Sequence, residues 1–206
     1  MKSESERMPL QEAVAAIHAA RRSDEVVVST MGSAREWMKL DPHPLDFPFV
    51  PSSMGQAPAL GFGLALARPD RRVIVLNGDG CMLMNLGSLV TITAERPANL
   101  ALIVFENGVY EVTGAQPTPG SPAARAAADP VDFAALARAC GFTSVHRFSN
   151  LERWRRELRG VLDAGGPSFT LLDVAPVPGA RGPRSPGPTG ERAQRFREAL
   201  GGHGRG

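Results

Sequence analysis

An aspartate between two glycines, Gly78-Asp79-Gly80, directly follows the apolar run 72–77. A carboxylate flanked by residues without side chains can be brought close to a ligand by the backbone. If a strand ends here and a helix begins, the N–H groups of Gly80, Cys81 and the helix start can bind a phosphate. The Asp79 carboxylate is a hard oxygen ligand of the kind that Mg²⁺ prefers. Taken alone, the stretch fits a plain strand-to-helix turn equally well.

A second oxygen ligand is available after the next apolar run. Residues 100–106 are followed by Asn107-Gly108. Because neighbouring parallel strands end at the same edge of a sheet, we expect Asp79 and Asn107 to lie near each other there. Mg²⁺ requires several oxygen ligands. The two motifs together therefore favour a site for a phosphate and its metal over a plain turn.

The elements that would position these residues can be predicted from hydrophobic patterns. Apolar runs without polar alternation are typical of strands buried on both faces of a parallel sheet. They cover residues 25–30, 72–77, 100–106 and 168–174, with 143–148 as a weaker fifth candidate. Helices are predicted at about 9–21, 54–67, 83–95, 131–140 and 150–164. Strands and helices in alternation predict an α/β fold, a three-layer sandwich with a mostly parallel central sheet.

The chain is expected to divide into three parts. Residues 1–24 are predicted to form an N-terminal helix, and residues 25–175 the α/β domain. Residues 176–206 are rich in Pro, Gly and Arg, and are predicted to be a tail with a short helix at about 190–200. Residues 114–130 are predicted to be a loop.

Composition narrows the class of protein. The 206 residues are 43% hydrophobic with a net charge of +2, so nucleic-acid binding is not indicated. The two cysteines, Cys81 and Cys140, form no metal-binding pattern, and we expect both to be reduced thiols. No run has the length of a membrane span and no signal peptide is apparent. We therefore expect a soluble cytoplasmic protein without a membrane or nucleic-acid partner.

The spacing of the two motifs resembles a known family. GDG, then 26 residues, then Asn is similar to the motif of thiamine diphosphate (ThDP) enzymes, in their pyrophosphate-binding domain. The resemblance extends over about residues 25–175. Ser52-Ser53-Met54-Gly55, GDGCMLMNLGSLVTI and NGVYEVTGAQPT particularly resemble the β subunit of sulfopyruvate decarboxylase. They are also similar to the C-terminal half of phosphonopyruvate decarboxylase.

The resemblance implies a site for ThDP and Mg²⁺ on this chain. The Asp79 and Asn107 side chains and the Val109 main-chain carbonyl would bind Mg²⁺. Gly80 and Cys81 would donate N–H groups to the diphosphate, although the family often has serine where Cys81 stands. Met54 would wedge under the cofactor. The other expected cofactor-binding residues are Ser52 (through its carbonyl), Ser53, Gly78, Gly108 and Tyr110.

Two residues are expected to face the substrate. The resemblance places Thr113 there. Arg35 follows a small-residue turn at 29–33, after the first predicted strand. Its guanidinium can bind an anionic substrate group in a fork, or it can pair with Glu36 or with a partner chain. With the resemblance, this favours a 2-oxo acid substrate that carries a second anionic group.

The resemblance also implies a partner. In the family, the glutamate that activates ThDP belongs to a separate pyrimidine-binding domain, for which a chain beginning with one helix has no room. We therefore expect the β-type subunit of a split ThDP-dependent 2-oxo acid decarboxylase, which is inactive without an α subunit that supplies this glutamate. The expected assembly is α2β2. A carboligase of acetolactate-synthase type is the alternative enzyme. A non-catalytic ThDP-domain scaffold is the other alternative, against which the retained metal ligands argue.

Three further patterns are interpreted as structural. Gly61-Phe62-Gly63 lies in a helical pattern, where glycines favour close helix packing over dinucleotide binding. The arginines of segment 153–159 fit a solvated helix face. The four histidines show no ligand spacing: His18, His43, His146 and His203.

Overall fold

The computed structural model describes residues 7–51, 54–125 and 129–201, and a single sheet organises them. Its seven strands are β1 (Met8–Pro9), β2 (Val26–Ser29), β3 (Asp46–Pro48), β4 (Val73–Gly78), β5 (Leu100–Glu106), β8 (Ser144–Phe148) and β9 (Ser168–Ala175). The order is β1-β9-β5-β4-β2-β3, and β8 also pairs with β9. All of these pairs are parallel. Because parallel sheets are buried on both faces, their strands are continuous apolar runs, as predicted here.

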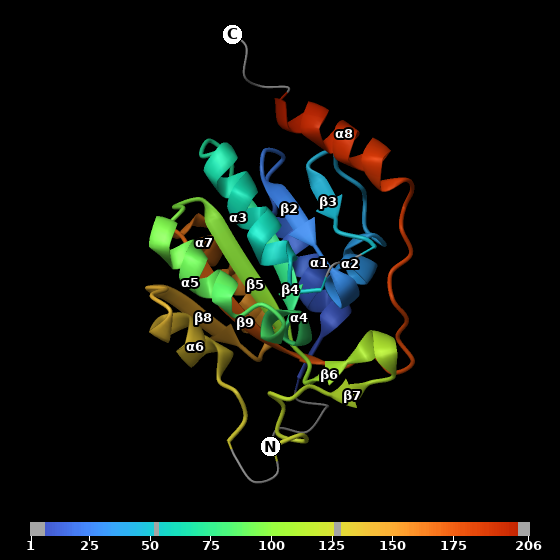
Figure 1. The fold of residues 1–206 in the computed structure, drawn as a ribbon, viewed down its shortest axis with the longest axis vertical. Helices are drawn as coiled ribbons and strands as arrows, with labels where there is room; N and C mark the ends of the chain where they lie inside the picture. The colour runs from blue at the N-terminus through green and yellow to red at the C-terminus, as the bar shows by residue number, and fades with distance from the viewer. Residues whose placement is uncertain (1–6, 52–53, 126–128, 202–206) are drawn as a thin grey trace.

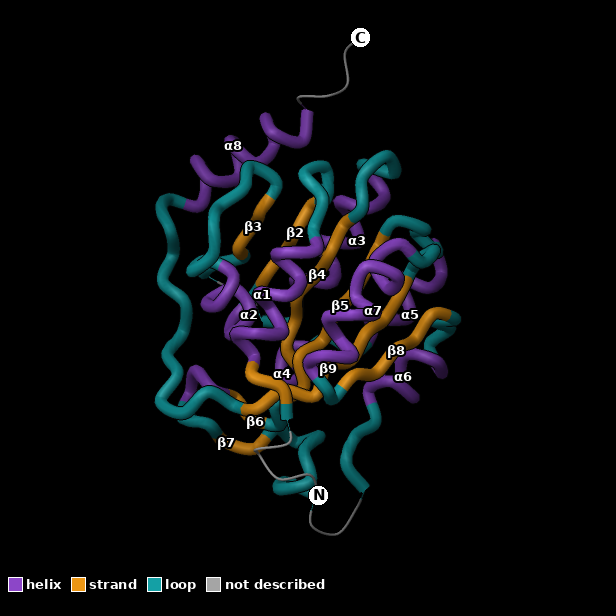
Figure 2. Tube along the Cα trace, turned by 180° about the vertical axis from the view of Figure 1, so that it is seen from behind, coloured by secondary structure: helices purple, strands orange, loops and turns teal. Residues whose placement is uncertain are grey.

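Helices cover both faces of the sheet (Figure 1). One face buries α3 (Ala57–Ala67), α5 (Gly87–Glu95) and α6 (Phe133–Ala139) against one hydrophobic cluster. The other face buries α1 (Leu10–Ala20), α2 (Met31–Trp37) and α7 (Leu151–Asp163), as the view from behind shows (Figure 2). Successive strand residues point to opposite faces, so that Val75 belongs to the first cluster and Leu76 to the second. The predicted α/β fold with a parallel central sheet is confirmed.

All five predicted strands are present in the seven-stranded sheet, but its two short strands, β1 and β3, were not predicted. β1 pairs with the end of β9, and β3 pairs with β2 at the edge of the sheet. Strands of two and three residues are too short to carry a hydrophobic pattern. The N-terminal segment is consequently not one helix over residues 1–24: in its described part, β1 precedes α1, which ends at Ala20.

The helix predictions need three corrections. The helix predicted at 54–67 begins only at Ala57, with Pro58 in its first turn. The helix predicted at 83–95 is replaced by two, α4 (Asp79–Leu83) and α5, because the chain turns between them. The small-residue turn expected at 29–33 is instead the end of β2 at Ser29 and the beginning of α2, where Thr30 and Ser33 form a capping box.

The glycine in the middle of α3 permits close packing against the sheet. A Cβ atom on Gly61 would lie 2.1 Å from Val75 Cγ2 of β4. That distance is impossible for a real side chain, so the interpretation as a packing residue is confirmed for Gly61. It is wrong for Gly63, because no heavy atom of the described residues, apart from its chain neighbours and the backbone of its own helix, lies within 4 Å of its Cβ position.

The segment after β5 is partly ordered into a small hairpin rather than being a plain loop. β6 (Val109–Tyr110) pairs antiparallel with β7 (Gln116–Pro117). Between them lies the short 3₁₀ helix η2 (Glu111–Thr113). The hairpin lies at the carboxyl ends of the central strands (Figure 1), where ligands bind in parallel sheets.

The C-terminal segment wraps around the domain and ends in α8 (Thr189–Gly201), beside β3 (Figure 2). Arg192 donates hydrogen bonds to the carbonyl groups of Pro48 and Val50, and its guanidinium lies over the Phe47 ring. Phe196 packs against the same ring with centroids 5.0 Å apart. The helix thus covers the β3 edge of the sheet. Among the described residues, no helix combines the length and the apolar character needed to cross a lipid bilayer.

Candidate functional site

A pocket of about 270 Å³ opens where β4 and β5 end. The two strands are in register, with Gly78 opposite Phe105, so the segments that follow them leave the sheet side by side. The expected site residues on its wall are Met54, Gly78, Asp79, Gly80, Cys81, Asn107, Val109, Tyr110 and Thr113. The structure therefore brings most of the sequence-predicted set around one cavity.

Asp79 links the two motifs. Its side chain is buried, and its Oδ1 accepts a hydrogen bond from the Gly80 N–H group at 2.9 Å. Its Oδ2 accepts one from the Gly108 N–H group, also at 2.9 Å. Burial raises the pKa of Asp79 to about 6, while these backbone hydrogen bonds oppose the rise. No ion pair joins Asp79 to a cationic side chain of the described residues, so its charge is not neutralised by the protein there.

The glycine after Asp79 is required by a close approach. A Cβ atom on Gly80 would lie 2.5 Å from Cε1 of the Tyr110 ring. The ring of Tyr110, in β6, thus packs directly on the backbone at the start of α4. A larger residue after Asp79 would therefore clash with the Tyr110 ring unless the ring moved.

The residues expected to hold the middle of the cofactor are only partly described. Ser52 and Ser53 lie outside the described residues. Met54 lines the pocket. The carbonyl of the adjacent Gly55 accepts a hydrogen bond from Asn85 Nδ2 at 3.1 Å, which fastens this segment to the chain just after α4.

Asn107 has a defined side-chain orientation. Its Oδ1 accepts a hydrogen bond from the Val109 N–H group at 3.0 Å, and its Nδ2 donates one to Glu111 Oε1 at 3.0 Å. The Arg7 Nη1 atom lies 3.3 Å from the Asn107 carbonyl oxygen and donates to it. Asn107 and Val109 both line the pocket close to the Asp79–Gly108 contact.

Cys81 is buried at the start of α4, and burial raises the pKa of its thiol. A neutral thiol is a weak hydrogen-bond donor, so the backbone N–H group is the part of Cys81 suited to an anion. The helix α4 begins at Asp79, which places this N–H group in its first turn.

The two residues expected at the substrate differ in their surroundings. Thr113 is exposed on the pocket wall, and its hydroxyl donates a hydrogen bond to Gln116 Oε1 at 2.8 Å. Arg35 lies in α2 and pairs with Glu36 at 2.7 Å and with Glu111 at 3.0 Å. Its third nitrogen donates to the Arg181 carbonyl at 3.4 Å. The structure thus favours the pairing alternative for Arg35 over a free anion-binding fork.

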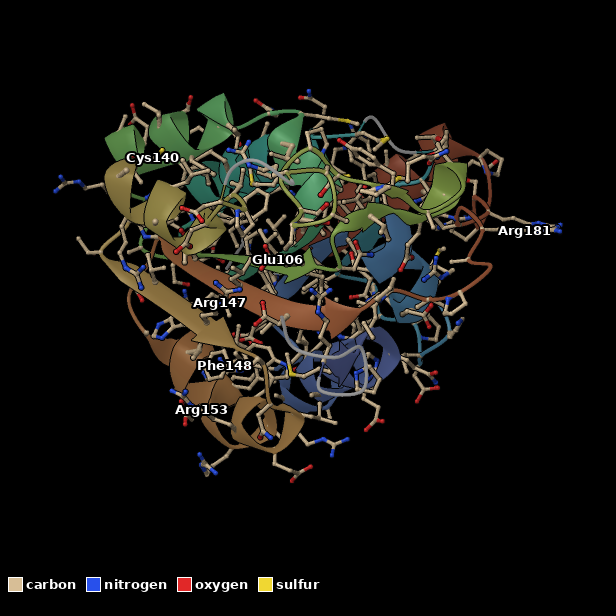
Figure 3. The ribbon with its side chains drawn as sticks, turned by 90° about the horizontal axis from the view of Figure 1, so that it is seen from below. Glu106, Cys140, Arg147, Phe148, Arg153 and Arg181 are labelled. Carbon is tan, nitrogen blue, oxygen red and sulfur yellow. The ribbon has the colours of Figure 1, made fainter. Side chains whose placement is uncertain are left out.

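Glu106, which precedes the expected metal ligand, points to other partners. Arg147 of β8 extends toward it (Figure 3), with Nη2 at 3.2 Å from Glu106 Oε2 and 2.9 Å from Asp173 Oδ1. Burial, and next the hydrogen bond with Asp173, raises the pKa of Glu106 to about 8. Glu106 is not on the pocket wall.

Four buried polar residues on the pocket wall were not predicted, Thr30, Ser33, Asn77 and Glu111, and the last two bear on the site. Asn77 has a fully buried Oδ1 atom that accepts no hydrogen bond from the described residues. Glu111 has a buried carboxylate bonded to the expected metal ligand. The sequence signal for Asn77 was its place directly before GDG, whereas the role of Glu111 depends on contacts with distant segments.

The residues present fit a Mg²⁺ ion bound with a diphosphate. Asp79 supplies a buried carboxylate without a cationic partner in the described part of the chain, and Asn107 supplies an oriented amide oxygen. Among residues 7–51, 54–125 and 129–201, no three His, Cys, Asp or Glu side chains gather as a metal-binding group. A site with one carboxylate, one amide and one carbonyl suits Mg²⁺ shared with phosphate oxygens rather than an all-protein cage.

Comparison with known proteins agrees with this geometry. Residues 25–174 match the family described as "Thiamine pyrophosphate enzyme, C-terminal TPP binding domain". Two thiamine diphosphate-dependent enzymes of known structure share the fold. One is a putative enzyme from Mycobacterium smegmatis, with a TM-score of 0.66 and 20% identity over 83% of this chain and 32% of that one. The other is 4-hydroxybenzoylformate decarboxylase from Rhodococcus jostii RHA1, with a TM-score of 0.68 and 19% identity over 84% of this chain and 34% of that one.

Closer relatives are found by sequence. The chain is 39% identical to phosphonopyruvate decarboxylase of Streptomyces hygroscopicus over 84% of its own length and 41% of that protein. It is also 39% identical to sulfopyruvate decarboxylase subunit beta of Methanothermobacter thermautotrophicus, over 74% of its own length and 75% of that subunit. It thus spans about two-fifths of the former and three-quarters of the latter. The chain belongs to the thiamine diphosphate-dependent decarboxylase family and carries its C-terminal cofactor-binding domain.

Proposed function

We propose that this chain is the β-type subunit of a split ThDP-dependent 2-oxo acid decarboxylase. The observation that carries the proposal is the buried Asp79 carboxylate, bonded to the Gly80 and Gly108 N–H groups and lacking a cationic partner among the described residues. This contact unites the two halves of the ThDP motif at one strand edge. A Mg²⁺ ion there would neutralise the carboxylate and connect it to the diphosphate.

Each residue has a distinct task in this proposal. Asp79, the Asn107 amide oxygen and the Val109 carbonyl would bind Mg²⁺, and the Gly80 and Cys81 N–H groups would bind the diphosphate. Met54 would support the bent cofactor, together with Ser52 and Ser53. Tyr110 packs on Gly80 and would limit the access of water to the diphosphate. Thr113, on the exposed side of the pocket, would contact the substrate.

Bound ThDP supplies a carbon nucleophile and an electron sink for the loss of CO₂ from a 2-oxo acid. The described residues around the pocket offer cofactor-anchoring groups, and the proposal assigns the activating glutamate to a partner. The relatives named subunit beta match this chain over about three-quarters of their own length, and that name implies an α partner. This supports a pyrimidine-domain α subunit, and we propose α2β2 as the assembly.

The names of the relatives support sulfopyruvate or phosphonopyruvate as substrate class, a 2-oxo acid with a second anionic group. Arg35 does not support this substrate class, because its guanidinium is already bonded to Glu36, Glu111 and the Arg181 carbonyl. We therefore expect part of the second anion's contacts to come from the partner subunit.

The test combines the purified chain with a candidate pyrimidine-domain subunit, such as one found in an adjacent reading frame, and measures CO₂ release from a panel of 2-oxo acids. We expect no turnover by either chain alone, turnover by the mixture, and loss of turnover when the partner's activating glutamate is replaced by glutamine. Preference for pyruvate or benzoylformate over every dianionic acid would overturn the substrate class. Product captured by an added carbonyl acceptor would support the carboligase alternative, and full activity of this chain alone would overturn the split site.

A further inference from the structure

Glu111 is a buried carboxylate that joins three separate segments at the edge of the pocket. Its side chain is only 5% exposed. Its Oε2 accepts a hydrogen bond from Arg35 Nη2 of α2 at 3.0 Å. Its Oε1 accepts one from Asn107 Nδ2 at 3.0 Å and another from the Val177 N–H group at 2.8 Å. Three donors at one carboxylate satisfy its charge and fix its position.

The contact with Asn107 fixes the orientation of its side-chain amide. An asparagine amide carries an acceptor oxygen on one side and a donor NH₂ group on the other. Because Glu111 accepts only, it retains the NH₂ group, and Oδ1 is directed to the other side, toward the Val109 N–H group. Only the oxygen end of an amide can bind Mg²⁺. Glu111 thus selects the orientation that a metal ligand requires.

Glu111 is itself held in place by Arg35, which has further ion-pair and hydrogen-bond partners. Arg35 donates to Glu111 through one nitrogen and to Glu36 through another, at 2.7 Å. Lys39 lies 2.6 Å from the second oxygen of Glu36. The Arg181 carbonyl accepts from the third Arg35 nitrogen, while the Arg181 side chain points away from the body of the protein (Figure 3). The chain of contacts runs from the surface of α2 to the expected metal ligand.

We propose that Glu111 is a positioning residue for Asn107 and that Arg35 anchors Glu111 instead of binding substrate. The inference rests on the proposed function, in which Asn107 binds the Mg²⁺ that accompanies ThDP. Neither residue is assigned as a metal ligand in this proposal. They act by keeping the Asn107 oxygen in place before the metal arrives, which reduces the cost of ordering it on binding.

The test titrates ThDP into the full 206-residue chain by calorimetry over a series of Mg²⁺ concentrations. Glu111→Gln keeps the size of the side chain but has only one acceptor oxygen for three donors. We expect it to raise the Mg²⁺ concentration at half-saturation by about tenfold or more, as loss of a residue that orients a metal ligand commonly does. Glu111→Ala serves as a second variant, and circular dichroism verifies that each chain is folded.

Glu25→Gln is the matched control. Glu25 is also buried, 3% exposed, and accepts hydrogen bonds from one arginine, Arg159, and one backbone N–H group, that of Arg22. It lies just before β2, at the amino end of the sheet. The control should lower the thermal midpoint but leave the Mg²⁺ half-saturation within about twofold of the wild type, because distant sites act independently.

A double-mutant cycle distinguishes positioning from a merely structural role. Asn107→Asp presents an oxygen at either end of the side chain, so its orientation no longer matters. The effect of Glu111→Gln on Mg²⁺ half-saturation should then fall to about threefold or less. An equal effect in both backgrounds would show that Glu111 acts through general stability or charge, and would overturn the inference.

A second readout needs neither metal nor cofactor. The Asn107 side-chain NH₂ resonance, identified by its loss in Asn107→Asp, should exchange slowly with water in the wild type and rapidly in Glu111→Gln. Rapid exchange in the wild type would contradict the hydrogen bond. Mg²⁺-dependent ThDP binding that Glu111→Gln leaves unchanged would overturn this inference alone, whereas a wild type without such binding would overturn the proposed function as well.

Discussion

Glu25 and Glu111 are similar buried carboxylates at opposite ends of the sheet, and they differ in what lies next to them. Each accepts hydrogen bonds from one arginine and one backbone N–H group. Around Glu25 the contacts continue to Asp163, which is half exposed and pairs with Arg22 and Arg159. Around Glu111 they continue to Asn107 and the pocket.

Burial and ion pairing alone therefore do not mark a functional residue. The Glu25 cluster fastens α7 to the start of β2, and its charges are balanced within the protein. The Glu111 cluster ends beside Asp79, a buried carboxylate that no described cationic side chain balances. An unbalanced charge in a pocket indicates a ligand, whereas a balanced one indicates structure.

The largest expected effect is the loss of ThDP affinity when Asp79, in the pocket, is substituted. Asp79→Asn keeps the shape of the side chain but removes its charge. We expect ThDP affinity in saturating Mg²⁺ to fall by about 100-fold or more, with the fold retained, because a carboxylate ligand of the metal is lost. Calorimetric titration measures it. Asp163→Asn, at the other end of the sheet, is the control and should leave the affinity unchanged.

The second largest effect is a loss of stability when Glu25, at the amino end of the sheet, is substituted. Glu25→Ala leaves Arg159 and the Arg22 N–H group without their buried acceptor. Because Arg159 is 29% exposed, we expect the free energy of unfolding to fall by about 2–3 kcal/mol rather than by the full value of a buried pair. Urea denaturation measures this loss. A large change in ThDP affinity of the folded variant would refute the separation of the two clusters.

A third change tests the backbone of the pocket. Gly80→Ala places a methyl group against the Tyr110 ring, where a Cβ would lie 2.5 Å from Cε1. We expect a loss of about 1–3 kcal/mol in stability, together with weaker ThDP binding, because overpacking displaces the loop. Removing the ring by Tyr110→Ala in the same chain should recover part of the stability. If the double variant is as unstable as the sum of the single ones, the close approach is not the cause.

The smallest effect is expected at an exposed ion pair. Arg155 pairs with Glu12 at 2.9 Å, and both side chains are about half exposed. Arg155→Ala should change the free energy of unfolding by less than about 0.5 kcal/mol, since solvent screens the pair. Urea denaturation compares it with Glu25→Ala. A loss as large as that of Glu25→Ala would mean that exposure is not what separates the two pairs.

Much of the fold was predictable because the central strands are continuous apolar runs. Residues 72–77 and 100–106 read as buried strands, and the structure has β4 and β5 at these positions. β3 and α2 were missed, since three strand residues hold no periodicity and α2 begins inside what reads as a turn. Boundaries next to the pocket were also missed, where α4 begins at Asp79 itself.

The candidate site was predictable only where sequence spacing carries the information. Asp79 and Asn107 could be paired because strand ends meet at one edge of a parallel sheet. Glu111 could not, because its donors Arg35 and Val177 lie 76 and 66 residues away along the chain. For the same reason the ion pair between Arg35 and Glu111 could not be predicted, because only the fold brings the two residues together.

Binding of ThDP to the wild-type chain, measured with Mg²⁺ and with EDTA, tests the proposed site. We expect binding in Mg²⁺ and at least about tenfold weaker binding in EDTA, because without the cation the buried Asp79 carboxylate would repel the diphosphate. Equal affinity under both conditions, or no binding at millimolar ThDP and Mg²⁺, would contradict the proposed site.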